Sequence, residues 1–95
     1  MIVKYSRESI DDLQRVVEFV EIKNPYAARR IAIDLQEGIA KLKQFPHIGL
    51  PVLNAPDSEQ FRDLYISHYT IRYLITDEVI YILRIWHHKE NEKNL

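Results

Sequence analysis

The segment FRDLYISHYTIRYLITDEVIYILRIWHH, residues 61–88, decides the fold, because it divides into three strand-like runs joined by very short connections. The runs Phe61–Ile66, Tyr69–Thr76 and Val79–Trp86 are rich in β-branched and aromatic residues, which favour a pleated surface. Two residues separate each run from the next. Connections this short join only antiparallel neighbours, since a parallel pair needs a crossover of about a dozen residues or more. The sequence therefore predicts a three-stranded antiparallel meander.

The register of the last two strands follows from the face that each residue occupies. An ideal two-residue turn would place Ile71 opposite Arg84. One extra residue in the turn instead pairs Arg72 with Arg84 and Ile71 with Ile85, and burial favours this register because a slip of one residue moves a whole face. The two arginines then lie side by side on an exposed face, where they either suit an acidic partner or are solvated apart.

Upstream of this segment, the sequence predicts a short strand followed by two helices. Residues Ile2–Tyr5 read as the strand, and Ser6 is a natural N-cap for the helix after it. Asparagine and proline at positions 24 and 25 end this first helix and begin the second, with the asparagine as N-cap. The helical spacing of the first helix is carried by Ile10, Leu13, Val16, Val17 and Val20.

The second helix is predicted to run until Pro46, and residues 47–60 read as a loop. Gly38 lies inside this helix, where either a close helix–helix crossing or a neutral substitution explains it. Its predicted buried stripe consists of Ala28, Ile31, Leu35, Ile39, Leu42 and Phe45. The expected fold is thus α+β: an N-terminal strand and a helical hairpin packed on an antiparallel sheet with a three-stranded C-terminal meander. We expect one domain over residues 1–95, with 89–95 as a flexible tail.

Composition limits the classes of function. The chain has 95 residues, enough for one domain, with 46% hydrophobic and 28% charged residues, as in folded globular proteins. It contains no cysteine, which excludes disulfide bonds and thiolate chemistry. We find no signal peptide and no apolar run near the roughly 20 residues of a membrane span, so we expect a cytoplasmic protein without membrane contact. The formal net charge of −1 argues against direct, sequence-specific nucleic-acid binding.

His87 and His88 follow the last strand and are the most conspicuous candidates for chemistry. Successive strand residues point to opposite faces, so we expect the two rings not to share a metal ion, and we predict neither a metal nor a cofactor. General acid–base work or a hydrogen bond to backbone at the sheet edge remain open for them. The tyrosines of the meander are expected to pack in the core rather than to stack on bases: Tyr65, Tyr69, Tyr73 and Tyr81.

The helical hairpin, the stretch FPHIGLP at residues 45–51 and the meander resemble the RelE/ParE superfamily of bacterial toxins, and more narrowly its ParE branch. The matching pattern is an arginine that opens a strand, a Tyr-x-Ile-x-Tyr strand at residues 69–73, an acidic turn, an apolar strand and His87. The resemblance implies the toxin of a type II toxin–antitoxin system, held inactive by a cognate antitoxin. A homodimer or a higher toxin–antitoxin complex is also implied.

The superfamily contains two biochemistries, and the resemblance implies one of them. RelE-like members cut messenger RNA in the ribosome, whereas ParE-like members inhibit DNA gyrase. This chain has Thr70 where the RelE pattern has an arginine, Leu64 in place of a second lysine, and no tyrosine after His88. We therefore expect a gyrase inhibitor that acts by binding, not an enzyme. The alternatives are a ribosome-dependent mRNA endoribonuclease and a degenerate toxin that only binds its antitoxin.

The target-binding surface is predicted at the end of the last strand and in the tail. Ile85 is expected to face the core, while Arg84 and Trp86 face outward, a pair of residue types common in protein interfaces. No residue is predicted to be catalytic. The full predicted target-binding set is Arg62, Arg72, Arg84, Trp86, His87, His88 and Lys89.

Overall fold

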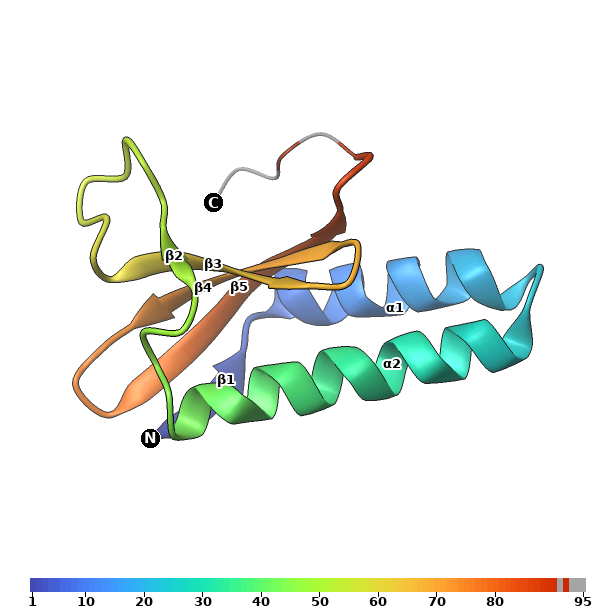
Figure 1. Cartoon of the computed structure of the whole chain (residues 1–95), viewed down its shortest axis with the longest axis horizontal. Coiled ribbons are helices and arrows are strands. Elements are labelled where there is room, and N and C mark those ends of the chain that lie inside the picture. The colour runs from blue at the N-terminus through green and yellow to red at the C-terminus, as the bar shows by residue number, and fades with distance from the viewer. Residues whose placement is uncertain (91, 93–95) are drawn as a thin grey trace.

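The computed structural model describes residues 1–90 and residue 92. Both helices lie on the same side of one five-stranded sheet, whose strand order is β1-β5-β4-β3-β2 (Figure 1). The predicted α+β fold is confirmed. In chain order the elements are β1 (Ile2–Tyr5), α1 (Arg7–Glu21), α2 (Pro25–Ala40), the 3₁₀ turn η1 (Lys41–Lys43), β2 (Leu50–Pro51), β3 (Phe61–Ile66), β4 (Tyr69–Ile75) and β5 (Val79–His87).

The helices begin where their capping residues predict. The Ser6 hydroxyl accepts a hydrogen bond from the Ser9 N–H at 3.0 Å, and the Asn24 side chain accepts one from the Ala27 N–H at 3.0 Å. Each cap satisfies a backbone donor that has no partner inside its helix. Among the described residues, neither helix combines the length and apolar character that a membrane crossing requires.

The sheet is mixed, which corrects the expectation of an antiparallel sheet. Strand β1 runs parallel to β5, with Ile2 opposite Val79 and Tyr5 opposite Ile82. The helical hairpin supplies the long crossover that a parallel pair requires, and a four-residue strand carries no local signal for its neighbour. The predicted loop 47–60 also contains β2, a two-residue strand that pairs with Arg62 and Asp63 of β3.

The predicted pairing of β4 with β5 is confirmed in the second half of β5. Arg72 lies opposite Arg84, and Ile71 lies opposite Ile85. Both isoleucines are fully buried, as burial of this face requires. The register that places the two arginines side by side is therefore the one that also completes the core.

The extra residue that creates this register lies inside β5, which corrects the prediction that it lies in the turn. Ile75 pairs with Ile80 and Tyr73 pairs with Ile82, which is the register of an ideal two-residue turn. The register then shifts between Arg72 and Tyr73, so Leu83 is the extra residue of a β-bulge. The bulge changes the alternation of faces and keeps three isoleucines of β5 in the core: Ile80, Ile82 and Ile85.

The core lies between the hairpin and the sheet. Most of the predicted stripe of α2 is buried there, but Phe45 is 58% exposed, because α2 ends at Ala40 and the 3₁₀ turn breaks the helical spacing. The main buried cluster consists of Val16, Leu35, Ile39, Leu42, Tyr69, Ile71, Tyr73, Ile75, Ile80, Ile82 and Ile85. Tyr69 and Tyr73 are in the core as predicted, whereas Tyr65 is 60% and Tyr81 37% exposed.

Both glycines mark close approaches. A Cβ on Gly38 would overlap the side chain of Ile66 on β3, so the close crossing is between helix and sheet, not between the two helices as expected. A Cβ on Gly49 would lie 2.7 Å from the Tyr73 hydroxyl oxygen and 2.8 Å from the Asp63 carbonyl oxygen. That hydroxyl also accepts from the Gly49 N–H at 3.0 Å and donates to the Pro46 carbonyl at 2.7 Å. The chain before β2 is thereby held against β4.

We expect Gly49→Ala to lower the free energy of unfolding by about 1–3 kcal/mol, because the added methyl group overlaps a buried hydroxyl and a backbone carbonyl. Gly38→Ala is the matched control. The atoms nearest to its methyl group belong to the Ile66 side chain and not to backbone, and alanine favours a helix by about 1 kcal/mol over glycine. Thermal and urea melting of both variants measures the difference. A Gly38→Ala protein that unfolds more easily than Gly49→Ala would contradict this account.

Candidate functional site

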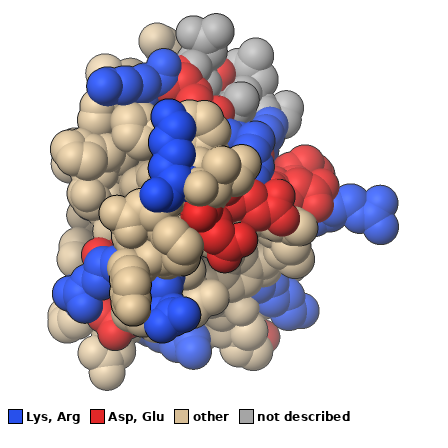
Figure 2. Space-filling view, turned by 90° about the vertical axis from the view of Figure 1, so that its right-hand side faces the viewer, with Lys and Arg blue, Asp and Glu red and all other residues tan. Residues whose placement is uncertain are grey.

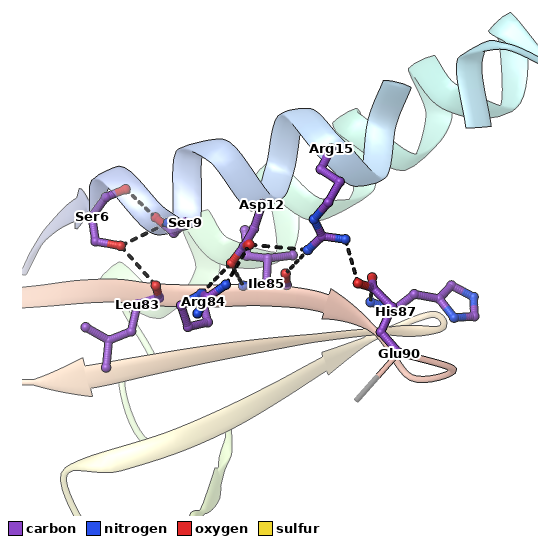
Figure 3. A network of polar contacts seen from close by, with 9 residues as sticks. All are labelled: Ser6, Ser9, Asp12, Arg15, Leu83, Arg84, Ile85, His87 and Glu90. Atoms are coloured by element: carbon purple, nitrogen blue, oxygen red, sulfur yellow. Dashed lines mark hydrogen bonds and ion pairs between the residues drawn. The ribbon is translucent and has the colours of Figure 1, made fainter. Parts of the chain in front are cut away.

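The second half of β5 is an edge that α1 covers with side chains. Strand β1 pairs with β5 only as far as Ile82, and beyond that point α1 runs alongside β5 (Figure 3). The Ser6 hydroxyl donates to the Leu83 carbonyl at 2.9 Å, and an Asp12 carboxylate oxygen accepts from the Ile85 N–H at 2.9 Å. Side chains of α1 therefore occupy the place that a neighbouring strand would take.

The same pattern continues to the end of the strand. Arg15 donates to the Ile85 carbonyl at 3.2 Å, and Glu90 accepts from the His87 N–H at 3.0 Å. Arg15 and Glu90 also form an ion pair at 2.6 Å (Figure 3). Glu90 belongs to the predicted flexible tail, and its ion pair with Arg15 connects that part of the tail to α1. Residues 91 and 93–95 of that tail lie outside the described residues.

Asp12 is the centre of this network. Its side chain is 5% exposed and accepts from Arg84 Nε at 2.8 Å, from Arg84 Nη2 at 3.0 Å and from Arg15 Nη2 at 3.2 Å. Burial on its own would raise the pKa of Asp12, but the hydrogen bonds from Arg84, from the Ile85 N–H and from Arg15 lower that pKa below its ordinary value. The carboxylate is thus stabilised in its charged form.

Arg84 and Trp86 do not form the exposed pair that we predicted. The Arg84 side chain is 24% exposed and holds Asp12. Trp86 is 5% exposed, so the prediction of an outward, accessible indole is wrong. The guanidinium of Arg72 lies over its ring, 5.2 Å from the centroid. The alternation of side chains along β5 predicts that Trp86 lies on the face away from the helices. It cannot predict that the side chain of Arg72 covers that face.

Arg72 forms a second buried ion pair, on the face of the sheet away from the hairpin. Its Nε and Nη2 donate to the two carboxylate oxygens of Asp63, each at 2.9 Å. Its Nη1 donates to Glu92 at 3.1 Å. The Arg72 side chain is 7% exposed, so it is neither splayed into solvent nor presented as an open cation. This bidentate geometry is the strongest that arginine makes with a carboxylate.

Arg62 holds the loop before β3. It donates to the carbonyls of His47 and Gly49 at 3.2 and 2.8 Å, and to the Glu59 carboxylate at 2.9 Å. The residue is 7% exposed. All three predicted arginines are thus engaged inside the fold, and a target reaches them only by competing with these bonds.

Three histidines meet where β4 begins and β5 ends. The rings of His87 and His88 are 4.7 Å apart between centroids, and His68 lies 5.1 Å from His88. The expectation that the two neighbouring rings point apart is wrong, because β5 ends at His87 and the chain turns there. Within the described part of the chain, no three side chains of the metal-binding types are placed to hold a metal ion.

His87 makes the backbone contact that we considered for it, since its Nδ1 accepts from the Lys89 N–H at 3.0 Å. Burial first, and then the neighbouring His88, His68 and Lys89, lower the pKa of His87. His88 and Lys89 are exposed. Of the predicted target-binding set, these two side chains are therefore the most accessible to a macromolecule.

A hollow of about 550 Å³ connects this corner to α1 and was not predicted from the sequence. Val16, Val20, Tyr69 and His87 line it, and Phe19 stands at its side with 71% exposure. Ile22 and Tyr26, at the turn between the helices, are 84% and 82% exposed. Figure 2 looks onto this end of the molecule and shows uncharged side chains beside a patch of acidic ones.

The exposure of Phe19 follows from a signal in the sequence. Phe19 lies between Val16 and Val20 but off the helical stripe that packs in the core, and a large apolar side chain off the stripe of an amphipathic helix faces solvent. Exposed apolar residues that gather at one end of a small domain are typical of a protein-binding surface. The arrangement is suited to holding a partner.

Comparisons with known proteins agree with this fold. The family described as ParE toxin of type II toxin–antitoxin system, parDE, matches residues 3–92. A chain in the structure of the chromosomal ParDE TA system from P. aeruginosa is 22% identical, with a TM-score of 0.76 over 92% of this chain and 95% of that one. The solution structure of the conserved hypothetical protein HP0894 from Helicobacter pylori is 16% identical, with a TM-score of 0.57 over 95% and 97%. A search of curated protein sequences gives no significant match.

We expect Asp12→Ala to lower the free energy of unfolding by about 3–5 kcal/mol, because it removes the buried carboxylate that accepts from Arg84 and from the Ile85 N–H. Asp11→Ala, one residue away and exposed, should stay within about 0.5 kcal/mol of the parent. Urea melting measures both.

The difference between parent and Asp12→Ala should also depend on pH. Because the folded state lowers the pKa of Asp12, its contribution is fully present above the ordinary aspartate pKa of about 3.9 and is lost as the pH falls through the folded value. Urea melts between neutral and acidic pH should therefore show the two proteins converging. A gap that stays constant or widens under acid would contradict this role of the carboxylate.

Proposed function

The chain belongs to the ParE toxin family of type II toxin–antitoxin systems, and on that premise we propose that it acts on DNA gyrase in the cytoplasm by binding rather than by catalysis. The family implies a cognate antitoxin as partner. We further propose that this antitoxin neutralises the toxin by covering the apolar end of the hairpin. We also propose that this chain is an active toxin.

One observation carries the choice of binding over RNA cleavage. Cleavage through the 2′-hydroxyl needs a group that takes the proton and cations that stabilise the phosphorane charge. The arginines that would supply those cations are bonded inside the fold: Arg62 to loop carbonyls, Arg72 to Asp63 and Arg84 to Asp12. To serve a transition state they would first have to leave buried partners, which is costly.

The histidine corner favours the second candidate, a ribosome-dependent ribonuclease. His87 and His88 lie close together and His68 joins them, and imidazole is the usual proton carrier near neutral pH. Lys89 follows directly and is exposed. The corner thus offers general acid–base groups, but Arg15, which lines the same hollow as His87, already binds Glu90 and Asp12.

The antitoxin surface is proposed from the exposed apolar residues of α1 and of the turn after it. Phe19, Ile22 and Tyr26 are each more than two-thirds exposed. Aromatic side chains that enter a partner's pocket dominate the energy of protein interfaces. The adjacent hollow beside Val16 and Val20 can receive an apolar side chain from the partner in turn.

We expect the purified protein to inhibit DNA supercoiling by gyrase and to leave ribosome-bound messenger RNA intact. Replacing the exposed His88 and Lys89 together by alanine should weaken the inhibition by about fivefold or more without changing the melting temperature. The matched control is the double alanine variant of Lys41 and Lys43, which are exposed on η1. It should inhibit as strongly as the parent.

Other outcomes of the same assays decide between the candidates. Cleavage of ribosome-bound message, lost in the His88 and Lys89 variant, would replace the gyrase proposal by the ribonuclease. A protein that affects neither gyrase nor ribosomes, yet binds its antitoxin, would be a degenerate toxin. Size-exclusion chromatography of the complex tests the predicted homodimer or higher assembly, which stays a prediction.

For neutralisation, we expect Phe19→Ser to weaken binding of the antitoxin encoded beside this gene by about tenfold, because an exposed aromatic anchor is lost while the core is untouched. Phe45→Ser is the control, since Phe45 is also exposed but lies after η1, away from the hairpin turn. Calorimetric titration of each variant gives the affinities. Equal losses in both variants would contradict the proposed location of the antitoxin surface.

A further inference from the structure

The chain turns after β5 in residues 87–90, which we call the terminal turn. Two of its backbone donors are bonded to histidines. The His88 N–H donates to the His68 carbonyl at 2.8 Å, and the Lys89 N–H donates to Nδ1 of the His87 ring at 3.0 Å. The exposed side chains of His88 and Lys89 therefore stand on a backbone whose conformation these two bonds fix.

Glu90 completes the terminal turn. Its N–H donates to the His87 carbonyl at 2.8 Å, and its carboxylate accepts from the His87 N–H at 3.0 Å and from Arg15 at 2.6 Å (Figure 3). These bonds join peptide groups, a carboxylate and a guanidinium, whose ordinary charges do not change between about pH 5 and pH 8. The bond to His87 Nδ1 differs from them, because its acceptor is an imidazole, which titrates in that range.

The two neighbouring imidazoles bond in opposite ways. Nδ1 of His87 accepts from the Lys89 N–H, so the neutral ring carries its hydrogen on Nε2. Nδ1 of His88 lies 3.1 Å from the His68 carbonyl oxygen, which can only accept, so this ring carries its hydrogen on Nδ1. Both nitrogens of an imidazolium are donors. A proton on His88 therefore preserves its bond, whereas a proton on His87 removes the acceptor of the Lys89 N–H.

The groups around His87 oppose its protonation. Burial first, and then His88, His68 and Lys89, lower the pKa of His87, and only the nearby Glu90 raises it. The ring is therefore neutral at neutral pH. Its bond to the Lys89 N–H is lost as the pH falls through the folded-state pKa, which lies below the ordinary histidine value of about 6.5. The titratable and charged groups that face the ring come from the start of β4, from the terminal turn and from α1: His68, Tyr69, His88, Lys89, Glu90 and Arg15.

We propose that His87 is a proton-sensitive positioning residue: its neutral ring holds the terminal turn that presents His88 and Lys89 to the target, and its protonation releases that turn. A protonated ring would direct a second N–H at the Lys89 N–H, and two donors cannot bond at 3.0 Å. The proposal rests on the proposed function for the identity of the target. The behaviour of the turn itself can be measured without any target.

The first test is nuclear magnetic resonance of the full chain labelled with ¹³C and ¹⁵N. At neutral pH, we expect the imidazole nitrogen shifts to place the hydrogen of His87 on Nε2 and that of His88 on Nδ1. The amide signal of Lys89 should follow the titration of His87. Between about pH 7.5 and about pH 5.5, the order parameters of the amides of His88 and Lys89 should fall from about 0.8 to below about 0.6.

His87→Asn separates the proton from the hydrogen bond. The asparagine side chain offers an oxygen in place of Nδ1, and this oxygen accepts at every pH used. We expect this variant to keep an ordered terminal turn at both pH values, whereas His87→Ala should lack that order at both. His47→Asn is the control, because His47 is exposed in the loop after η1 and should leave the pH dependence of the turn as in the parent.

The second test is the affinity for gyrase at the same two pH values. We expect acid to weaken binding of the parent by about threefold or more beyond its effect on His87→Asn, because only the parent loses the presented turn. Titration of gyrase and of His88 affects both proteins alike and cancels in this comparison.

The proposal is overturned if the Lys89 amide of the parent does not follow His87, if both rings carry their hydrogen on the same nitrogen, or if His87→Asn loses order in acid as the parent does. Equal effects of acid on the gyrase affinity of parent and His87→Asn also overturn it. A parent that binds no gyrase at either pH refutes the proposed function instead, and the order of the terminal turn then decides the role of His87 alone.

Discussion

The carboxylate of Asp12 is the constraint on which the rest of the molecule depends. It accepts hydrogen bonds from the Ile85 N–H and from Arg84, and it does so while almost completely buried. Strand β1 ends at Tyr5, opposite Ile82, and this leaves the following edge of β5 without a strand partner among the described residues. A side chain must therefore satisfy that edge, because buried backbone groups without a partner are costly. Helix α1 is held to the sheet by this polar contact as well as by its apolar stripe.

A buried carboxylate in turn requires cations, and this explains where the arginines are. Arg84 and Arg15 neutralise Asp12, and on the opposite face Arg72 neutralises Asp63. Removing one member of such an ion pair leaves the other as an uncompensated buried charge, so each residue of a pair requires its partner. The sheet consequently presents few open cations in the described part of the chain, even though the sequence places two arginines opposite each other.

The sequence predicts what local signals determine. The strands of the meander, the caps at Ser6 and Asn24 and the pairing of Ile71 with Ile85 all follow from spacing and residue type. The bulge, the burial of Trp86 and the role of Asp12 do not, because each depends on residues about seventy positions apart or on a covering side chain. Alternation identifies the face of a strand residue but not what covers that face. The exposure expected for Trp86 was therefore wrong, and the target-binding role of this region stays a prediction.

The two edges of the sheet differ in how far their backbone groups are already bonded, and this decides which edge is open to a partner. On the β5 side, side chains of α1 and Glu90 already bond the backbone, so a further strand would have to displace them. On the β3 side, β2 is only two residues long, and among the described residues the edge of β3 beyond it has no strand partner. The apolar end of the hairpin is reached from a third direction (Figures 1 and 2). A net charge of −1 provides little long-range attraction to nucleic acid, so the exposed apolar residues at the end of the hairpin are better suited to a protein partner.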